Sequence, residues 1–133
     1  CCFVMLNPST SDEIHDDPTI RRCIGFAKRF DCRTLEVVNL FALRATNPQD
    51  LFDSSEAGID IVGKGNDQHI AEACNSSRLI ICAWGNHGSY LGRDKEVLSM
   101  ITTKYALKIN HKTGQPSHPL YLPASSQLEL LNK

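Results

Sequence analysis

Polar side chains that can pair with other polar groups follow the apolar runs of this 133-residue sequence. Asn7 closes the first run, Asn39 lies near the end of the second, and the third leads into Trp84-Gly85-Asn86-His87-Gly88. A fourth run ends in Asn110-His111, and His118 follows a short turn. An Asn amide places a donor beside an acceptor, which matches the paired edge groups of a nucleobase. One such Asn is commonly a turn residue, but four in the same relation to strands favour a binding site.

The apolar runs predict the strands that would bring these side chains together. The runs at residues 1–6, 35–41 and 79–84 are nearly continuous, which is typical of strands covered on both faces. A fourth strand is expected at residues 105–109. Because the carboxyl ends of parallel strands meet at one edge of a sheet, the polar strand ends are expected to face one crevice.

Helical patterns lie between these strands. Apolar residues at helical spacing predict helices over residues 17–31, from residue 66, over 89–103 and over 125–131, and residues 53–66 are expected to form the longest connection. Alternating strands and helices indicate right-handed crossovers. We therefore expect one α/β domain over residues 1–133, a three-layer α/β/α sandwich with a short, mostly parallel four-stranded sheet.

The first polar strand end contains a proline. Pro8 biases Asn7 toward an extended backbone, so the Asn7 amide is aimed rather than free. Ser9 and Thr10 then offer hydroxyls and backbone amides. A neutral amide can orient a water molecule without being a strong base, which suits a reaction whose leaving group departs as a stabilised anion. A His near that leaving group, such as His118, can donate a hydrogen bond in either protonation state.

Charged and aromatic residues near the predicted crevice have several interpretations. Arg44 and Arg93 lie just past strand ends and are candidates for binding the phosphate of a nucleotide or strand. The basic residues of the helix over 17–31 are more typical of a solvated surface. Trp84 either packs in the core or stacks on a base. Tyr121 follows His118 and is a further candidate for substrate contact.

An acidic cluster precedes the first predicted helix. Its members, Asp12, Glu13, His15, Asp16 and Asp17, could ligate a divalent cation. Such runs are more commonly solvated loops, and Asp17 already serves as a helix cap before Pro18. We expect no metal and no cofactor.

Composition limits the class of protein. Hydrophobic residues make up 41% and charged residues 22%, and the net charge of −1 argues against coating nucleic acid through bulk electrostatics. Six cysteines without a CxxC pair fit free thiols in a reducing cytoplasm. No apolar run approaches the roughly 20 residues of a membrane span. The sequence opens inside a strand without Met, so we expect an N-terminal segment to be missing from it.

Two resemblances follow from longer motifs. MLNPSTSDEIHDDPTIRRCIGFAKRF, VVNLFALRATNP, AWGNHG and GQPSHPLYL occur in this order and resemble the bacterial and phage family called domain of unknown function 1643. More distantly, Leu6-Asn7-Pro8-Ser9, Val38-Asn39, Trp84-Gly85 and His118-Pro119-Leu120 are similar to ordered motifs of the uracil-DNA glycosylase superfamily. The second resemblance implies that superfamily's three-layer fold.

The glycosylase resemblance also implies roles for individual residues. Asn7 would position an attacking water, Asn39 would read a base edge, and His118 would stabilise negative charge on the base carbonyl. The candidate site therefore has Asn7 and His118 as catalytic residues. Its candidate substrate-binding residues are Pro8, Ser9, Thr10, Asn39, Arg44, Trp84, Gly85, Asn86, His87, Arg93 and Tyr121.

These observations predict a protein that binds a nucleobase, a nucleotide or nucleic acid and has no membrane partner. It would hydrolyse an N-glycosidic bond in DNA or in a nucleotide. The first alternative is a non-catalytic module that recognises a modified base or small nucleotide in the same pocket. A second alternative is an unrelated small polar substrate.

Overall fold

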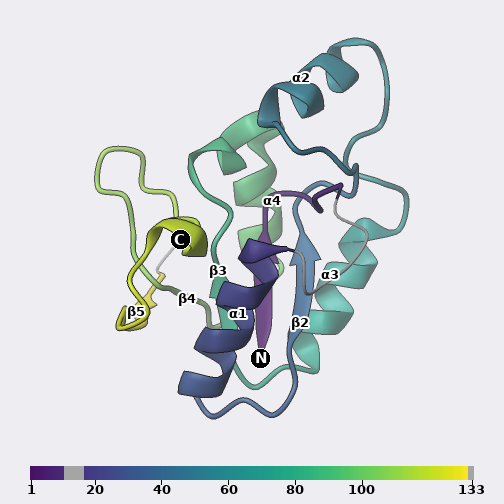
Figure 1. The fold of residues 1–133 in the computed structure, drawn as a ribbon. Helices are drawn as coiled ribbons and strands as arrows, with labels where there is room; N and C mark the ends of the chain where they lie inside the picture. Colours follow the sequence, from purple (N-terminus) through teal and green to yellow (C-terminus); the bar gives the residue numbers. More distant parts are fainter. Residues whose placement is uncertain (11–16, 132–133) are drawn as a thin grey trace.

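The computed structural model describes residues 1–10 and 17–131 and has a mixed α/β fold. Five strands form one sheet in the order β2-β1-β3-β4-β5 (Figure 1). The strands are β1 (Cys2–Met5), β2 (Glu36–Asn39), β3 (Ile80–Cys82), β4 (Tyr105–Ala106) and β5 (Glu129–Leu130). The helices are α1 (Pro18–Arg29), α2 (Pro48–Glu56), α3 (Asn66–Asn75) and α4 (Arg93–Leu98), with 3-10 helices η2 (Asn86–Gly92) and η3 (Pro119–Tyr121).

The sheet is mostly parallel, as predicted, but it has five strands rather than the predicted four. Strands β1 to β4 pair in parallel, whereas β5 pairs antiparallel with β4. The short helix predicted over residues 125–131 is wrong, because that segment contains β5. There Leu130 pairs with Tyr105, and the Leu131 amide donates to the Lys104 carbonyl at 2.9 Å. Pairing with β4 supplies backbone hydrogen bonds that the local sequence pattern does not reveal.

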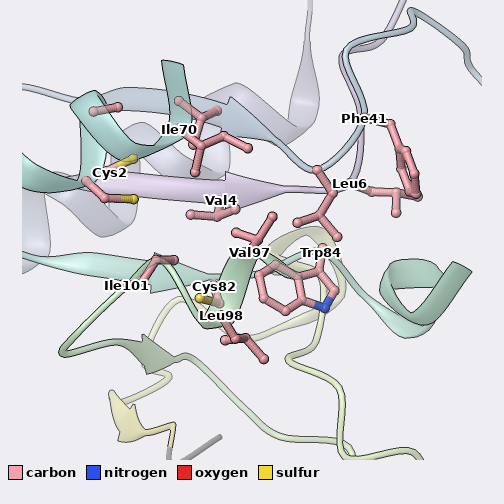
Figure 2. Packing of buried hydrophobic residues seen from close by; sticks show 14 of the residues in the cluster. Cys2, Val4, Leu6, Phe41, Ile70, Cys82, Trp84, Val97, Leu98 and Ile101 are labelled. Atoms are coloured by element: carbon pink, nitrogen blue, oxygen red, sulfur yellow. The ribbon is translucent and has the colours of Figure 1, made fainter. Parts of the chain in front are cut away.

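Alternate residues of β1 enter two separate cores, which explains why the strand is apolar throughout. Val4 packs in a core with residues of α3 and α4, which cover one face of the sheet. Phe3 packs in a second core with Cys23 and Phe26 of α1, which covers the other face. Figure 2 shows the first core, with Val4, Leu98 and Ile101 around the sheet. Every side chain of β1 is buried, so none is left to face water.

The helices differ from the sequence prediction at several ends. Asp17 and Pro18 begin α1 as expected, and α1 ends at Arg29. The predicted helix over 89–103 is shorter, because Leu91 and Gly92 have φ of 57° and 66° and separate η2 from α4. Helix α2 was not predicted, and the connection expected over residues 53–66 is wrong at its start, because residues 53–56 belong to α2. In the described residues, no helix has the length and apolar character needed to cross a membrane.

Candidate functional site

A cleft of about 1140 Å³ lies at the carboxyl ends of β1 to β4. The loops after these strands line it, together with the first turn of α1 and the segment from Ser117 to Leu122. The cleft contains Asn7, Asn39 and His118, which the sequence places 32 and 79 residues apart. The parallel sheet therefore brings the predicted catalytic and base-reading residues to one place.

The Asn7 side chain joins two neighbouring loops. Its Nδ2 donates to the carbonyl oxygens of Pro8 at 3.1 Å, Ala45 at 2.8 Å and Leu43 at 3.4 Å. These bonds fix the orientation of the amide, because only the nitrogen can donate to carbonyl oxygens. The Asn7 nitrogen is thus occupied by the backbone, and only Oδ1 remains as an acceptor for a ligand or water.

Asp17 connects the loop after β1 to α1 and also lines the cleft. Its Oδ1 accepts from the Thr19 and Ile20 amides, and its Oδ2 accepts from the Ser9 hydroxyl at 3.0 Å. The sequence predicted Asp17 as a helix cap and as a member of the acidic cluster, but not as a residue of this cleft. Asp17 follows the Asn7-Pro8-Ser9 motif in the sequence, and this position is the one signal that could have linked Asp17 to the cleft. The contact between Ser9 and Asp17 joins residues eight positions apart, so no local pattern predicts it.

Two buried side chains hold the end of β2, where Asn39 lies. Asn66 Nδ2 donates to the carbonyl oxygens of Asn39 at 3.0 Å and Leu40 at 3.2 Å, and Arg93 Nε donates to Leu40 at 2.7 Å. Asn66 is 8% exposed and Arg93 is 1% exposed. The Asn39 side chain lines the cleft and has no hydrogen-bond partner within residues 1–10 and 17–131. Its donor and acceptor are both available.

Arg93 does not line the cleft, contrary to its expected role as a substrate-binding residue. It lies in the interior, where it pairs with Asp67 at the start of α3. A buried guanidinium needs compensating partners, and the Leu40 carbonyl and Asp67 supply them. Arg93 therefore supports the end of β2 from behind. Asn66, which shares this role, was predicted only as the start of a helix, and it is the first residue of α3 after the N-cap Gly65.

His118 lies beside the end of β3, close to Gly85. A Cβ added at Gly85, where φ is 80°, would lie 3.8 Å from the Cβ of His118. His118 Nδ1 accepts a hydrogen bond from the Leu120 amide at 3.2 Å, so the neutral ring carries its proton on Nε2. Burial lowers the pKa of His118, and the Asp17 carboxylate partly opposes this effect. His118 is thus a neutral Nε2–H donor at pH 7.

Trp84 packs in the core rather than standing free in the cleft. Its side chain is 1% exposed, and its Nε1 donates to Gln115 Oε1 at 2.8 Å. Gln115 Nε2 in turn donates to Asp94 at 2.8 Å. A Cβ on Gly88 would lie 2.0 Å from the Trp84 indole, so the chain passes directly over the ring. This buried network anchors the segment that leads to His118.

Polar residues after β3 are largely bonded to neighbouring loops. Asn86 Oδ1 accepts from Asn110 Nδ2 at 3.1 Å and from the Thr113 hydroxyl at 2.9 Å. The His87 ring contacts Phe52 of α2, with 5.6 Å between ring centroids. Both residues line the cleft, and among residues 1–10 and 17–131 the Asn86 amide nitrogen has no hydrogen-bond partner.

Two cations line the described part of the cleft. Arg44 Nη1 donates to the Ser9 carbonyl at 3.1 Å, which tethers its exposed side chain to the neighbouring loop after β1. Lys108 follows β4 and was not predicted as a site residue. Thr10 does not line the cleft, and its hydroxyl pairs at 2.6 Å with that of Thr46, which does.

The cleft thus contains most of the predicted site residues, although Thr10 and Arg93 lie outside its lining. Those that line it are Asn7, Pro8, Ser9, Asn39, Arg44, Trp84, Gly85, Asn86, His87, His118 and Tyr121. In the part of the chain that the structure describes, no group of His, Cys, Asp and Glu is arranged to hold a metal. Of the acidic cluster considered as a metal site, Asp12, Glu13, His15 and Asp16 lie outside the described residues.

Fold and site together define an α/β protein with a cleft of mixed polar and apolar lining at the carboxyl edge of a mostly parallel sheet. Residues 1–120 match the family described as "Protein of unknown function (DUF1643)", and the chain belongs to that family. No curated protein and no solved structure is significantly similar to it.

Proposed function

We propose that the cleft binds a nucleobase or nucleotide and that the protein hydrolyses its N-glycosidic bond. The convergence of three complementary groups in one cleft carries this proposal. Asn39 offers a donor and an acceptor, Asn7 offers an acceptor, and His118 offers a donor. Asn39 and His118 suit a planar ligand with donors and acceptors on its edge, as nucleobases have, and Asn7 supplies an acceptor for a water molecule beside it.

Each group has one task in the proposed reaction. Asn39 pairs with the base edge, and His118 Nε2–H donates to a base carbonyl. Asn7 Oδ1 accepts a hydrogen bond from water, whose oxygen attacks the sugar C1′ while the bond from C1′ to the base nitrogen breaks. The bonding electrons leave with the base, and the water proton passes to solvent or to the departing base. His118 stabilises the resulting anion, an effect of about 3 kcal/mol for a well-placed donor.

We also propose a distant evolutionary relationship for this protein. The order of Asn7-Pro8, Asn39, Trp84-Gly85 and His118-Pro119 along the chain supports a distant relationship to the uracil-DNA glycosylase superfamily. The mixed α/β fold with helices on both faces of the sheet is compatible with that relationship. A fold alone does not define an activity, so the proposed chemistry rests on the site.

One observation favours a non-catalytic alternative. The Asn7 amide nitrogen is fully engaged by backbone carbonyls, which gives Asn7 a structural task independent of any reaction. A binding module would retain the Asn39 and His118 contacts to a base and need no attacking water.

Base release and base binding separate these possibilities. The protein is incubated with deoxynucleosides and with single strands containing uracil or modified bases, and released base is measured by chromatography. Calorimetry measures binding of the same nucleosides. Release of free base supports the enzyme, and binding without release supports the module. If no base is released and none binds below millimolar concentration, both are contradicted.

A His118→Asn variant tests the proposed donor without removing the local cap. The Asn oxygen can still accept from the Leu120 amide, because Asn is a strong N-cap residue, but no donor remains at the Nε2 position. We expect base release to fall by about 100-fold or more, with little change in thermal stability. His69→Asn, on the exposed surface of α3, is the matched control and should leave release unchanged.

A further inference from the structure

The cations of the cleft indicate how much negative charge its ligand carries. In the described residues, only Arg44 and Lys108 contribute a Lys or Arg side chain to the lining. Neither forms an ion pair with a carboxylate in residues 1–10 and 17–131. Cationic side chains at a ligand cleft that lack a carboxylate partner are suited to an anionic group on the ligand.

Arg44 and Lys108 follow different strands of the sheet. Arg44 follows β2 and Lys108 follows β4, and strands β1 and β3 separate these two in the sheet. The Arg44 guanidinium reaches the Ser9 carbonyl in the loop after β1, and β1 lies two strand spacings, or about 10 Å, from β4. Arg44 is the better phosphate ligand, because its hydrogen bond to the Ser9 carbonyl already restricts the side chain. The planar guanidinium retains further N–H donors for bidentate contact with phosphate oxygens.

Helix α2 disfavours additional phosphates of a ligand beyond Arg44. Its first residue, Pro48, lines the cleft, and its sequence PQDLFDSSE contains three acidic residues and no basic one. Figure 1 shows α2 beyond the carboxyl end of the sheet. Helix α2 therefore adds the negative charges of Asp50, Asp53 and Glu56 on the side of the cleft that Pro48 lines, and negative charge disfavours additional phosphates there. The charges therefore favour a ligand with one phosphate group near Arg44.

We propose that the cleft takes a mononucleotide, with its single phosphate bound by Arg44, rather than a nucleic acid strand. This inference rests on the proposed base-binding function and narrows its substrate class. The base would lie against Asn39, which precedes Arg44 by five residues and lines the same cleft.

Three ligands that differ in phosphate number test this inference. Calorimetry compares deoxynucleosides, the matching 5′-monophosphates and hexanucleotides without terminal phosphate, for the four common bases and uracil. We expect the preferred monophosphate to bind at least tenfold more tightly than its nucleoside and no more weakly than the hexanucleotide. The plot of log affinity against log salt should have a slope of roughly −1 for the monophosphate, whereas five neutralised phosphates of a strand would give roughly −3.5.

Variants assign the phosphate contact. Arg44→Gln should reduce monophosphate affinity about tenfold and leave nucleoside affinity unchanged, whereas Lys108→Gln and the exposed Arg33→Gln should preserve the advantage of the monophosphate. The salt dependence of the unmodified protein provides a test that requires no substitution.

The failures of the two proposals can be told apart. If nucleosides bind but the phosphate adds nothing, or if the hexanucleotide binds tenfold more tightly with a steep salt slope, the mononucleotide inference is overturned and base binding stands. Loss of the phosphate advantage in Lys108→Gln alone would overturn the assignment to Arg44. If nucleosides, monophosphates and hexanucleotides all fail to bind below millimolar concentration, the base-binding function fails and this inference falls with it.

Discussion

Asn7→Asp is an isosteric change that separates the structural task of Asn7 from its proposed chemical one. It replaces the nitrogen that donates to the carbonyls of Pro8, Leu43 and Ala45 with an oxygen that can only accept when ionised. Two of these bonds, at 2.8 and 3.1 Å, have good lengths, and the third, at 3.4 Å, is weak. Losing them and leaving carbonyls unpaired should cost about 3 kcal/mol at pH 7.

The cost of Asn7→Asp should depend on pH in a defined direction. A protonated carboxyl can again donate one hydrogen bond to a carbonyl, whereas the ionised form faces carbonyl dipoles, so folding raises the pKa of the new carboxyl. Its destabilisation is therefore smallest near the unfolded pKa of about 3.9 and grows as the pH rises through the folded pKa. The variant should be closest to the unmodified protein in acid.

Urea unfolding at pH 4 and pH 7 measures this difference, with fluorescence of the single Trp, Trp84, as the probe. Asn75→Asp is the matched control, because Asn75 is exposed at the end of α3, and it should cost no more than about 0.5 kcal/mol. Equal stability of Asn7→Asp and the unmodified protein at pH 7 would refute the reasoning that the Asn7 amide joins the two loops.

Three further predictions concern the support of the site. Gly88→Ala would place a Cβ 2.0 Å from the buried Trp84 indole and should lower the free energy of unfolding, measured in urea, by about 3 kcal/mol. By contrast, the Cβ added in Gly25→Ala would meet no neighbouring atom within 4 Å, so this change should stabilise α1 by about 0.5 to 1 kcal/mol. Gln115→Leu removes the partner of the Trp84 Nε1–H and should cost about 2 kcal/mol with a red shift in fluorescence if the indole becomes hydrated. Burial lowers the pKa of His118 in the folded protein, so the imidazole of the unfolded chain is protonated first as the pH falls. The free energy of unfolding should therefore decrease below about pH 6.5. His118→Asn should flatten this pH dependence.

Local sequence patterns predicted the central strands because each is buried on both faces. Continuous apolar runs gave β1 and β3, and the polar residues after them marked the carboxyl edge where the cleft lies. Helix α2 escaped prediction although it begins with Asn47-Pro48, a capping pair like that of α1. Leu51 is its only buried residue, so its apolar stripe is too weak to identify from spacing.

Contacts between distant residues limited prediction of the site. The position of Arg93 after a strand suggested a phosphate ligand, but its buried hydrogen bond joins residues 53 positions apart and turns the side chain away from the cleft lining. Asn66 reaches the end of β2 across 27 residues. No local pattern encodes such partners, because they depend on how α3 and α4 pack against the sheet.

Residue-specific nuclear magnetic resonance offers the most direct test of the claim that the cleft binds a nucleobase. Deoxynucleosides of each base are titrated into uniformly labelled protein, and the side-chain signals of Asn39 and His118 are compared with those of exposed Asn75. Asn39→Asp and His118→Asn provide the signal assignments. We expect saturable shifts of the Asn39 amide and the His118 ring at one affinity, while the Asn75 signals remain unchanged. Saturable binding of a base that leaves both cleft residues unperturbed, or no saturable binding of any base, would contradict the claim.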